Sequence, residues 1–507
     1  MRMEEHVSAV FTMACAALAL SGAALAQIPM QEGDWPKLFE NYVEPIPYDV
    51  DGDGDLELIV NGLTNGITIY EHDGSIYGTI PVPPDAVFFR EVIAVGDLQG
   101  DGVVDIVAIV SGRGNDFNKD NRLFVRDPEG NCHYELCTMR FERNTMWTHA
   151  GTTLFDLDGD GDLEIIITWV DPLDYLGVIV LQLDETGNSF ERSWQHIIDA
   201  EDSLTTVTDV AAGDIDGDGK AEILFGSTGS PLADGGFLYA FHHDGASVKN
   251  WPIELDAGLE HPPVLADLTG DGRLEIIING YGNAGLKVWN HRAQLLWTGV
   301  GRGRTPVVAD ITGDGIPEVL TQARAYFHDG VWTGWSYAVT NPNGLSVADI
   351  DSDGDMEILI GGSGSDGLRA FHHDGSPVNG FPLFVDPDYR HTSMTPVLAD
   401  LDRDGDIEII VTGAYLAVWD LPGTYDPTRV EWPMYQHDPQ RVGRYRQCRS
   451  GTPADLNGDG VVSTPDLHIL FSAWGSNPAH RGDLTGDGTV DAQDVRALVA
   501  QWGSWAP

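Results

Sequence analysis

Asp49-Val50-Asp51-Gly52-Asp53-Gly54-Asp55-Leu56-Glu57 is the stretch that decides the fold. Carboxylates occupy positions one, three, five and nine of this nine-residue loop, and a glycine occupies position six. Two like charges about 4 Å apart repel by roughly 4 kcal/mol even at an effective dielectric constant of about 20, so the bare loop would open. Calcium takes about six to eight oxygens from alternate loop positions and a backbone carbonyl, and it needs a glycine at the sharp turn. The spacing therefore predicts a calcium loop.

The same loop occurs eight times, at intervals of 39 to 59 residues. Glycine stands at position six and an acidic residue at position nine in every copy. Positions one, three, five, seven and nine are the predicted ligands, with position seven supplying its backbone carbonyl. Copy by copy they are Asp49, Asp51, Asp53, Asp55 and Glu57; Asp97, Gln99, Asp101, Val103 and Asp105; Asp156, Asp158, Asp160, Asp162 and Glu164; Asp214, Asp216, Asp218, Lys220 and Glu222; Asp267, Thr269, Asp271, Arg273 and Glu275; Asp310, Thr312, Asp314, Ile316 and Glu318; Asp349, Asp351, Asp353, Asp355 and Glu357; Asp400, Asp402, Asp404, Asp406 and Glu408.

Position three distinguishes the copies. Five of them carry aspartate there, whereas Gln99, Thr269 and Thr312 offer only neutral oxygens. Because fewer charged ligands weaken calcium binding, the second, fifth and sixth loops are predicted to bind most weakly.

Each loop lies between two strand patterns. A short apolar stretch such as residues 395–399 precedes it, and a β-branched run such as residues 163–167 follows, which is typical of strands covered on both faces. A third strand, an Asp-Gly turn and a fourth strand come next, as in residues 237–255. Four antiparallel strands repeated eight times predict an all-β, eight-bladed β-propeller over residues 27–445, with seven blades and an irregular hairpin as the alternative.

Two segments have the form of a fourth strand that closes the ring. Residues 35–39 and 432–435 both resemble residues 381–384, so either end of the propeller could supply the strand that completes the last blade. We favour the N-terminal strand.

The loop between two short strands, repeated around a propeller, resembles the FG-GAP or VCBS repeats of integrin alpha-subunit propellers and of many secreted bacterial proteins. The resemblance covers most of residues 30–445 and implies the fold and calcium. It leaves function open, since the family includes adhesion proteins, lectin-like binders and a few polysaccharide lyases.

A second module, residues 454–507, follows a linker over residues 446–453. Two twelve-residue loops of EF-hand type are each followed by a helical apolar pattern, first with Leu467, Leu470, Phe471 and Trp474 and then with Val495, Leu498, Val499 and Trp502. The predicted calcium ligands are Asp455, Asn457, Asp459, Val461, Ser463, Asp466, Asp483, Thr485, Asp487, Thr489, Asp491 and Asp494. The pair resembles a type I dockerin, which implies docking onto a cohesin-type partner. The two copies differ at positions ten and eleven, so a purely structural calcium module stays open.

The chain is strongly acidic, with a formal net charge of −51. Positions one, three, five and nine of the propeller loops together with the tail ligands account for 36 of the 79 acidic residues, so the acidity is largely ligand material. About ten calcium ions would reduce the charge to −31. The charge excludes nucleic acid and anionic membranes as natural partners.

The first 26 residues have the form of a signal peptide, with Ala24-Leu25-Ala26 before the cleavage point, which predicts a secreted or cell-surface protein; a membrane anchor is the alternative. No later stretch is long enough to span a bilayer. Of the three cysteines that remain, Cys132 and Cys137 are close enough in sequence to close a small loop, and Cys448 is left over.

No catalytic arrangement with the required spacing is present, whether a nucleophile elbow, a zinc helix or a phosphate loop. The pairs His242-His243 and His372-His373 are interpreted as turn residues in preference to transition-metal ligands. Longer loops are expected on the rim opposite the calcium loops, where aromatic and basic residues suit sugar stacking and carboxylate binding. They are Trp147, His149, Trp169, Tyr175, His261, Arg302, Arg304, Tyr389, Arg390 and His391.

These features lead to two hypotheses. The first is a non-catalytic calcium-binding propeller that binds a glycan or a protein through that rim, as in adhesion, and is tethered by its tail to a cohesin-type partner. The second is a carbohydrate-active enzyme, a polysaccharide lyase or a glycoside hydrolase, with its site on the same rim. The basic residues Arg441, Arg444, Arg446 and Arg449 are expected to pair with nearby carboxylates or to contact the tail.

Overall fold

The computed structural model describes most of the propeller and a small part of the tail. The described residues are 28–31, 33–38, 44–62, 66–81, 83, 86–112, 122–134, 138–140, 151–170, 175–184, 186–199, 206–228, 235–280, 285–301, 304–322, 324–336, 342–362, 367–384, 395–413, 415–426, 429–445, 467, 470, 490 and 492–499.

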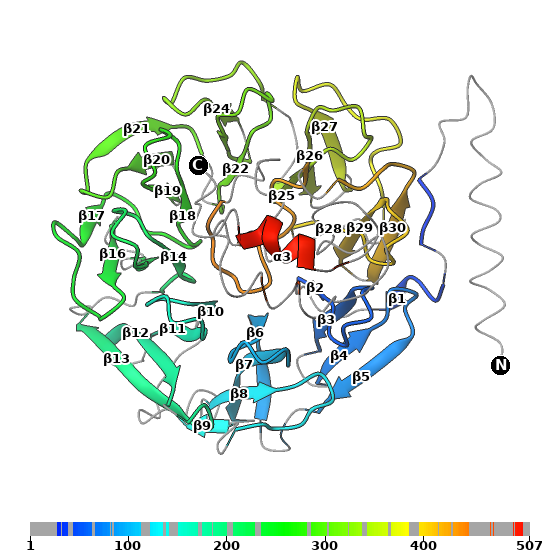
Figure 1. Cartoon of the computed structure of the whole chain (residues 1–507). Coiled ribbons are helices and arrows are strands. Elements are labelled where there is room, and N and C mark those ends of the chain that lie inside the picture. Colours follow the sequence, from blue (N-terminus) through cyan, green and yellow to red (C-terminus); the bar gives the residue numbers. More distant parts are fainter. Residues whose placement is uncertain are drawn as a thin grey trace, which may run out of the picture.

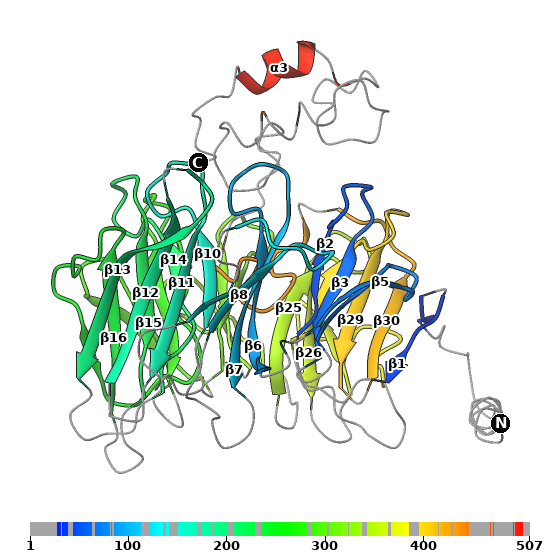
Figure 2. The ribbon, with the colours of Figure 1, turned by 90° about the horizontal axis from the view of Figure 1, so that it is seen from below.

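Eight antiparallel sheets stand around a central axis, each with its first strand nearest the axis (Figure 1). Viewed from the side, the separate sheets stand next to one another with their strands running from one rim to the other (Figure 2). The prediction of an eight-bladed, all-β propeller is therefore confirmed, and the seven-bladed alternative is wrong.

The first four blades each have four described strands. Their bounds are β2 Ile46–Tyr48, β3 Glu57–Asn61, β4 Ile67–Tyr70 and β5 Ile76–Ile80; β6 Ala86–Gly96, β7 Asp105–Gly112, β8 Arg122–Arg126 and β9 Thr138–Arg140; β10 Thr152–Phe155, β11 Glu164–Val170, β12 Tyr175–Leu183 and β13 Phe190–Asp199; β14 Ala211–Gly213, β15 Glu222–Gly226, β16 Gly236–His242 and β17 Ile253–Leu255.

Blades 5 and 8 also have four strands, with β1 (Lys37–Leu38) as the fourth strand of blade 8, whereas blades 6 and 7 are less regular. Blades 6 and 7 have three named strands each among the described residues, and single bridges such as Leu368–Leu383 mark the path of a fourth. The bounds are β18 Val264–Ala266, β19 Glu275–Gly280, β20 Gly285–Trp289 and β21 Leu295–Gly299; β22 Val307–Ala309, β23 Glu318–Leu320 and β24 Ala325–Tyr326; β25 Pro342–Ala348, β26 Glu357–Gly362 and β27 Arg369–His372; β28 Val397–Ala399, β29 Ile407–Thr412 and β30 Tyr415–Leu421.

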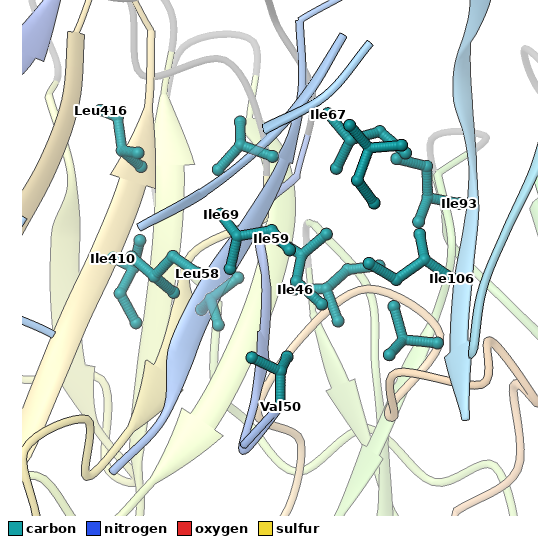
Figure 3. Close-up of a cluster of buried hydrophobic side chains, with 14 of the residues drawn as sticks. Ile46, Val50, Leu58, Ile59, Ile67, Ile69, Ile93, Ile106, Ile410 and Leu416 are labelled. Carbon is teal, nitrogen blue, oxygen red and sulfur yellow. The ribbon is translucent and has the colours of Figure 1, made fainter. Parts of the chain in front are cut away.

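The second strand is buried along its length in seven blades and over residues 105–110 in blade 2, as its β-branched run predicts. Its side chains alternate between the two neighbouring blades. In blade 1, Leu58 points toward Ile410 of blade 8, whereas Ile59 points toward Ile106 of blade 2 (Figure 3). Each of these side chains stabilises the fold by roughly 1.5–3 kcal/mol when fully buried, so no blade is stable without its neighbours.

The ring closes through its N-terminal strand. β1 (Lys37–Leu38) pairs with β30 and becomes the fourth strand of blade 8, which confirms the favoured closure. The alternative strand at residues 432–435 is wrong, because that segment lies elsewhere.

Residues 429–445 run across the inner strands and form what we call the axial segment, orange in Figure 1. Its backbone pairs with the first strands of blades 7, 8, 2, 3, 4 and 5. Within it Arg441, 6% exposed, donates to Glu44 Oε2 at 3.2 Å, and Gln436 donates to the carbonyl of Val210 at 2.9 Å. The expectation that Arg441 pairs with a carboxylate is confirmed, and the axial segment itself was not predicted.

The tail is described only in part. The predicted second helix is present as α3 (Ala492–Val499), with Leu498 buried and Val499 exposed, and Leu467 and Leu470 of the first predicted helix are helical. Phe471, Trp474, Trp502, the linker and the 26-residue leader lie outside the described residues. No helix in the described part is long and apolar enough to cross a membrane. Cys132 is disulfide-bonded, while Cys137 and Cys448 are outside the described part.

Candidate metal sites

All eight predicted loops lie on one rim, between the first and second strands of their blades. In each blade the residue before position one pairs with position nine, as Phe155 does with Glu164 and Ala348 with Glu357. The eight loops therefore start and end at equivalent points of their sheets.

The loop backbone is left-handed at two positions. Position six is glycine in all eight loops, with φ between 82° and 109°. In the third loop this residue is Gly161, with φ 100°. Position four, which the sequence pattern did not single out, is also left-handed, and there six glycines are joined by Ser352 (φ 60°) and Arg403 (φ 55°). Residues with a Cβ pay roughly 1–2 kcal/mol in this conformation, which explains why glycine predominates.

These turns direct backbone N–H groups at the carboxylates. In the third loop, Asp156 accepts from Gly159 at 2.7 Å and from Gly161 at 3.1 Å. Asp158 and Asp160 each accept from the amide two residues further on. The carboxylates are thereby fixed close together, and the ligand atoms of Asp156, Asp158 and Glu164 lie within 4.8 Å of one another.

The position-nine residue makes the same backbone contact in every loop. Its carboxylate accepts a hydrogen bond from the position-two amide in all eight loops, at 2.5 to 3.3 Å. All eight side chains are between 0 and 6% exposed. Some of them accept a further hydrogen bond, as Asp105 does from the hydroxyl of Tyr134. Carboxylates buried this deeply are nevertheless strongly undersolvated, so each of these groups needs either a proton or a cation.

The pKa values express that need. Burial raises the pKa of Asp105 to about 6, of Glu57, Glu222, Glu275 and Glu357 to about 7, of Glu164 and Glu318 to about 8, and of Glu408 to about 9. Neighbouring loop carboxylates add to the effect, as Asp158 does for Glu164.

Several carboxylate oxygens of the loops are buried without a hydrogen-bond partner. They are Asp216 Oδ1, Asp349 Oδ1, Asp400 Oδ1, Asp406 Oδ1 and Glu408 Oε1. An oxygen of this kind is rare in proteins and is a ready ligand for a hard cation.

Neighbouring loops are hydrogen-bonded to one another. At two interfaces between blades the amide at position eight donates to the position-two carbonyl of the preceding loop, from Leu163 to Leu98 (3.1 Å) and from Ala221 to Leu157 (3.2 Å). The same bond joins Leu56 to Leu401 (2.8 Å) where blade 8 meets blade 1. Loop conformation in one blade is thus linked directly to the next.

The loops without aspartate at position three use that residue differently. Gln99 donates to the carbonyl of Gly187 in blade 3, and Thr312 donates to Glu318 of its own loop at 3.4 Å. Charge is also reduced elsewhere, since Arg429 of the axial segment lies 3.3 Å from Asp349 Oδ2 and donates to the carbonyl of Gly354.

The histidine pairs reach the loops. His242 and His372 lie directly across the sheet from the position-nine residues Glu222 and Glu357, at Nδ1–Oε1 distances of 2.8 and 2.9 Å. They also cap the Asp-Gly turns through their backbones, as interpreted from sequence. Their contact with the loop carboxylates was not predicted, because the register between neighbouring strands is not visible in a local sequence pattern.

On the opposite rim, the described residues form only part of the surface that was expected to stack against sugars. Trp169 is 1% exposed and packs in the core, so it is unavailable for stacking and its assignment to an open rim was wrong. His261 is largely buried, which lowers its pKa to about 4 with the nearby Arg304 charge contributing, and Tyr175 is half-buried. The other six rim residues lie outside the described part: Trp147, His149, Arg302, Tyr389, Arg390 and His391.

Asp494 lies in α3, and the other eleven predicted tail ligands fall outside the described residues.

Comparison with known protein families identifies the same repeats. The FG-GAP-like repeat model matches residues 49–108, 156–225 and 349–411, each match beginning at position one of a loop and ending in the second strand of the next blade. The chain thus carries FG-GAP-like repeats within an eight-bladed propeller. No curated protein sequence matches it at a significant level.

Three rhamnogalacturonan lyases are among the solved structures that share the fold. The rhamnogalacturonan lyase PL11 of Bacillus licheniformis is 17% identical with a TM-score of 0.55, covering 83% of this chain and 80% of that one. The exotype rhamnogalacturonan lyase YesX (16%, TM-score 0.54; 82% and 78%) and the rhamnogalacturonan lyase YesW (18%, TM-score 0.52; 84% and 82%) are similar to the same extent. At this identity the likeness describes the fold.

Proposed function

We propose that this chain is a calcium-binding β-propeller in which Ca²⁺ ions stabilise the eight loops of one rim. The observation that carries the proposal is the set of eight buried position-nine carboxylates, each of which accepts from its position-two amide and has a raised pKa. Residues at positions one, three, five and nine would supply carboxylate or neutral oxygens, and position seven a backbone carbonyl. Bound Ca²⁺ supplies the positive charge that lets these carboxylates stay ionised at neutral pH.

Oxygen donors at alternate positions favour calcium over softer metals. Carboxylate and carbonyl oxygens suit hard ions, and a flexible loop with this many donors suits calcium more than the smaller, strictly octahedral magnesium. The loops with Gln99, Thr269 and Thr312 would bind more weakly, since they lack one charge.

The wider role follows from the outer parts of the chain. The leader and the paired tail loops favour an exported protein whose propeller binds a glycan or a protein and whose dockerin-like module attaches to a cohesin-type partner. Helix α3, with its buried Leu498, supports a folded tail. The calcium loops serve as stabilisers in this account, and the ligand binds on the opposite rim.

A second candidate is polysaccharide lysis. The three structural neighbours above are rhamnogalacturonan lyases and cover more than four fifths of this chain, which favours an acidic polysaccharide as substrate. Incubation of the chain with rhamnogalacturonan and other acidic polysaccharides, with and without Ca²⁺, separates the two candidates. Release of unsaturated products supports lysis, whereas retention on the polymer without products supports binding.

The calcium proposal is tested by thermal unfolding of the full chain in saturating Ca²⁺ and after its removal. Saturation at about 100 times the dissociation constant stabilises by roughly 2.7 kcal/mol per site. An unfolding midpoint that is the same in both conditions would overturn the proposal.

A further inference from the structure

We infer that the seventh loop selects a transition metal of the zinc class over calcium. Its donor set includes a nitrogen, since Asp351, Glu357 and the imidazole of His372 place ligand atoms within 4.8 Å of one another. His242 makes the equivalent contact in the fourth loop, but among the described residues only the seventh of these two loops has an arginine paired with its position-one carboxylate. The inference rests on the proposed metal-binding role of the loops and goes beyond it by naming a different ion for one of them.

The sheet register places the imidazole there. His372 of β27 pairs directly with Glu357 of β26, and residues paired across antiparallel strands project from the same face. His372 is 25% exposed and Glu357 is fully buried, so the imidazole lies between the buried carboxylate and solvent. Imidazole nitrogen is a preferred ligand of zinc and its neighbours in the periodic table, whereas calcium prefers oxygen.

The axial segment reduces what the loop can offer to calcium. Arg429 lies 3.3 Å from Asp349 Oδ2 and also donates to the carbonyl of Gly354, so the position-one carboxylate is partly neutralised. Calcium needs about six to eight oxygens and loses affinity with each lost charge. Zinc needs only four ligands, and two carboxylates with one histidine supply three of them.

An independent observation indicates a ligand at this point. Asp349 is 6% exposed, and its other oxygen, Oδ1, is buried without a hydrogen-bond partner. The ligand atoms of Asp349, Asp351 and Asp353 also lie within 4.8 Å of one another, so Asp349 faces the same space as the three-residue set. It is the candidate fourth ligand.

The neighbouring histidine provides a matched control. His373 follows His372 on the same turn, but its Nδ1 lies 3.3 Å from Asp355 Oδ2, at position seven, outside the three-residue set. Removing His373 leaves all the proposed zinc ligands in place, whereas removing His372 takes away the only nitrogen among them.

The test is a Zn²⁺ titration of the full chain in excess Ca²⁺, in competition with a chromophoric chelator. We expect one tightly bound Zn²⁺ per chain, an affinity at least about tenfold lower in His372→Ala, and wild-type affinity in His373→Ala. We also expect Arg429→Gln to lower the preference for Zn²⁺ over Ca²⁺, because Asp349 then regains its full charge.

Unchanged zinc affinity in His372→Ala, or no zinc uptake in the presence of Ca²⁺, would overturn the inference. Thermal unfolding of each variant in Ca²⁺ alone shows whether it folds. Calcium binding by the other loops is measured in the same samples, so failure of the zinc site is distinguishable from failure of the calcium proposal.

Discussion

Arg403 in the eighth loop places its Nη2 atom 3.7 Å from Oδ2 of Asp49 in the first loop. These two residues are 354 positions apart in sequence and meet where the last blade closes against the first. Arg403 occupies position four of its loop with a left-handed φ of 55°, where six other loops have glycine. The ion pair therefore comes with a local backbone cost, and the backbone bond from Leu56 to Leu401 reinforces the same contact.

Substitution of Arg403 separates the ion pair from the backbone cost. Arg403→Gly and Arg403→Ala both lose the pair with Asp49, which is exposed and contributes about 0.2–1 kcal/mol. Only alanine retains the left-handed penalty, so the glycine variant is expected to be more stable than the alanine variant by about 1 kcal/mol. Denaturant unfolding in Ca²⁺ measures the difference, and an alanine variant as stable as the glycine variant would contradict the assignment of strain.

Glu164→Gln is expected to act in opposite directions with and without calcium. In saturating Ca²⁺ it removes a ligand of the third loop and should cost roughly 2–3 kcal/mol. In metal-free buffer at neutral pH it removes a buried carboxyl that must take up a proton on folding because its pKa is raised to about 8. The glutamine amide oxygen still accepts from Leu157, so the variant should equal or exceed the wild type in stability. Unfolding midpoints in the two buffers give the comparison. A loss of equal size in both would indicate a purely structural role.

The metal-free protein should become less stable as the pH rises, and bound calcium should offset this loss. In the folded, metal-free protein the buried carboxyl groups bind protons more strongly than in the unfolded chain. The pKa of Glu164 is about 8 and that of Glu408 about 9 in the folded protein, against 4.5 for a glutamate in the unfolded chain. That stabilisation is complete below about pH 4.5 and is lost as the pH rises through about 7 to 9. Metal-free protein should thus lose stability between pH 5 and pH 8, and the gain from added Ca²⁺ should grow over the same interval. A calcium effect that is equal at both pH values would count against this account.

The axial segment should be essential for the ring. Arg441→Ala leaves Glu44 buried without its ion-pair partner and is expected to cost about 3–5 kcal/mol. Arg496→Ala, on the exposed face of α3, is the control and should leave the unfolding midpoint within about 0.5 kcal/mol of the wild type. Equal midpoints for the two variants would mean that the axial segment is dispensable.

The repeat made much of this fold predictable. A loop whose ligands are adjacent in sequence is a local pattern, and eight copies of it between β-branched runs determine the blade number, the inner strands and the common rim. Closure by the N-terminal strand was predictable for the same reason, since residues 35–39 repeat the pattern of a fourth strand.

The features that were missed depend on contacts between distant residues. The axial segment has no periodicity, because each of its residues meets a different blade. His372 reaches its loop through cross-strand register, and Trp169 is buried because it ends an inner strand that is packed on both sides. The left-handed conformation at position four was not predicted, since Ser352 and Arg403 replace the glycine that the other six loops have there.

The most direct test of the account is the number of calcium ions bound per full-length chain, measured by equilibrium dialysis and atomic emission in Ca²⁺ alone. The account predicts about ten, of which eight belong to the propeller loops and two to the tail, with Glu164→Gln binding one fewer. A chain that binds no more than one or two ions, with wild-type and Glu164→Gln proteins giving the same number, would contradict it.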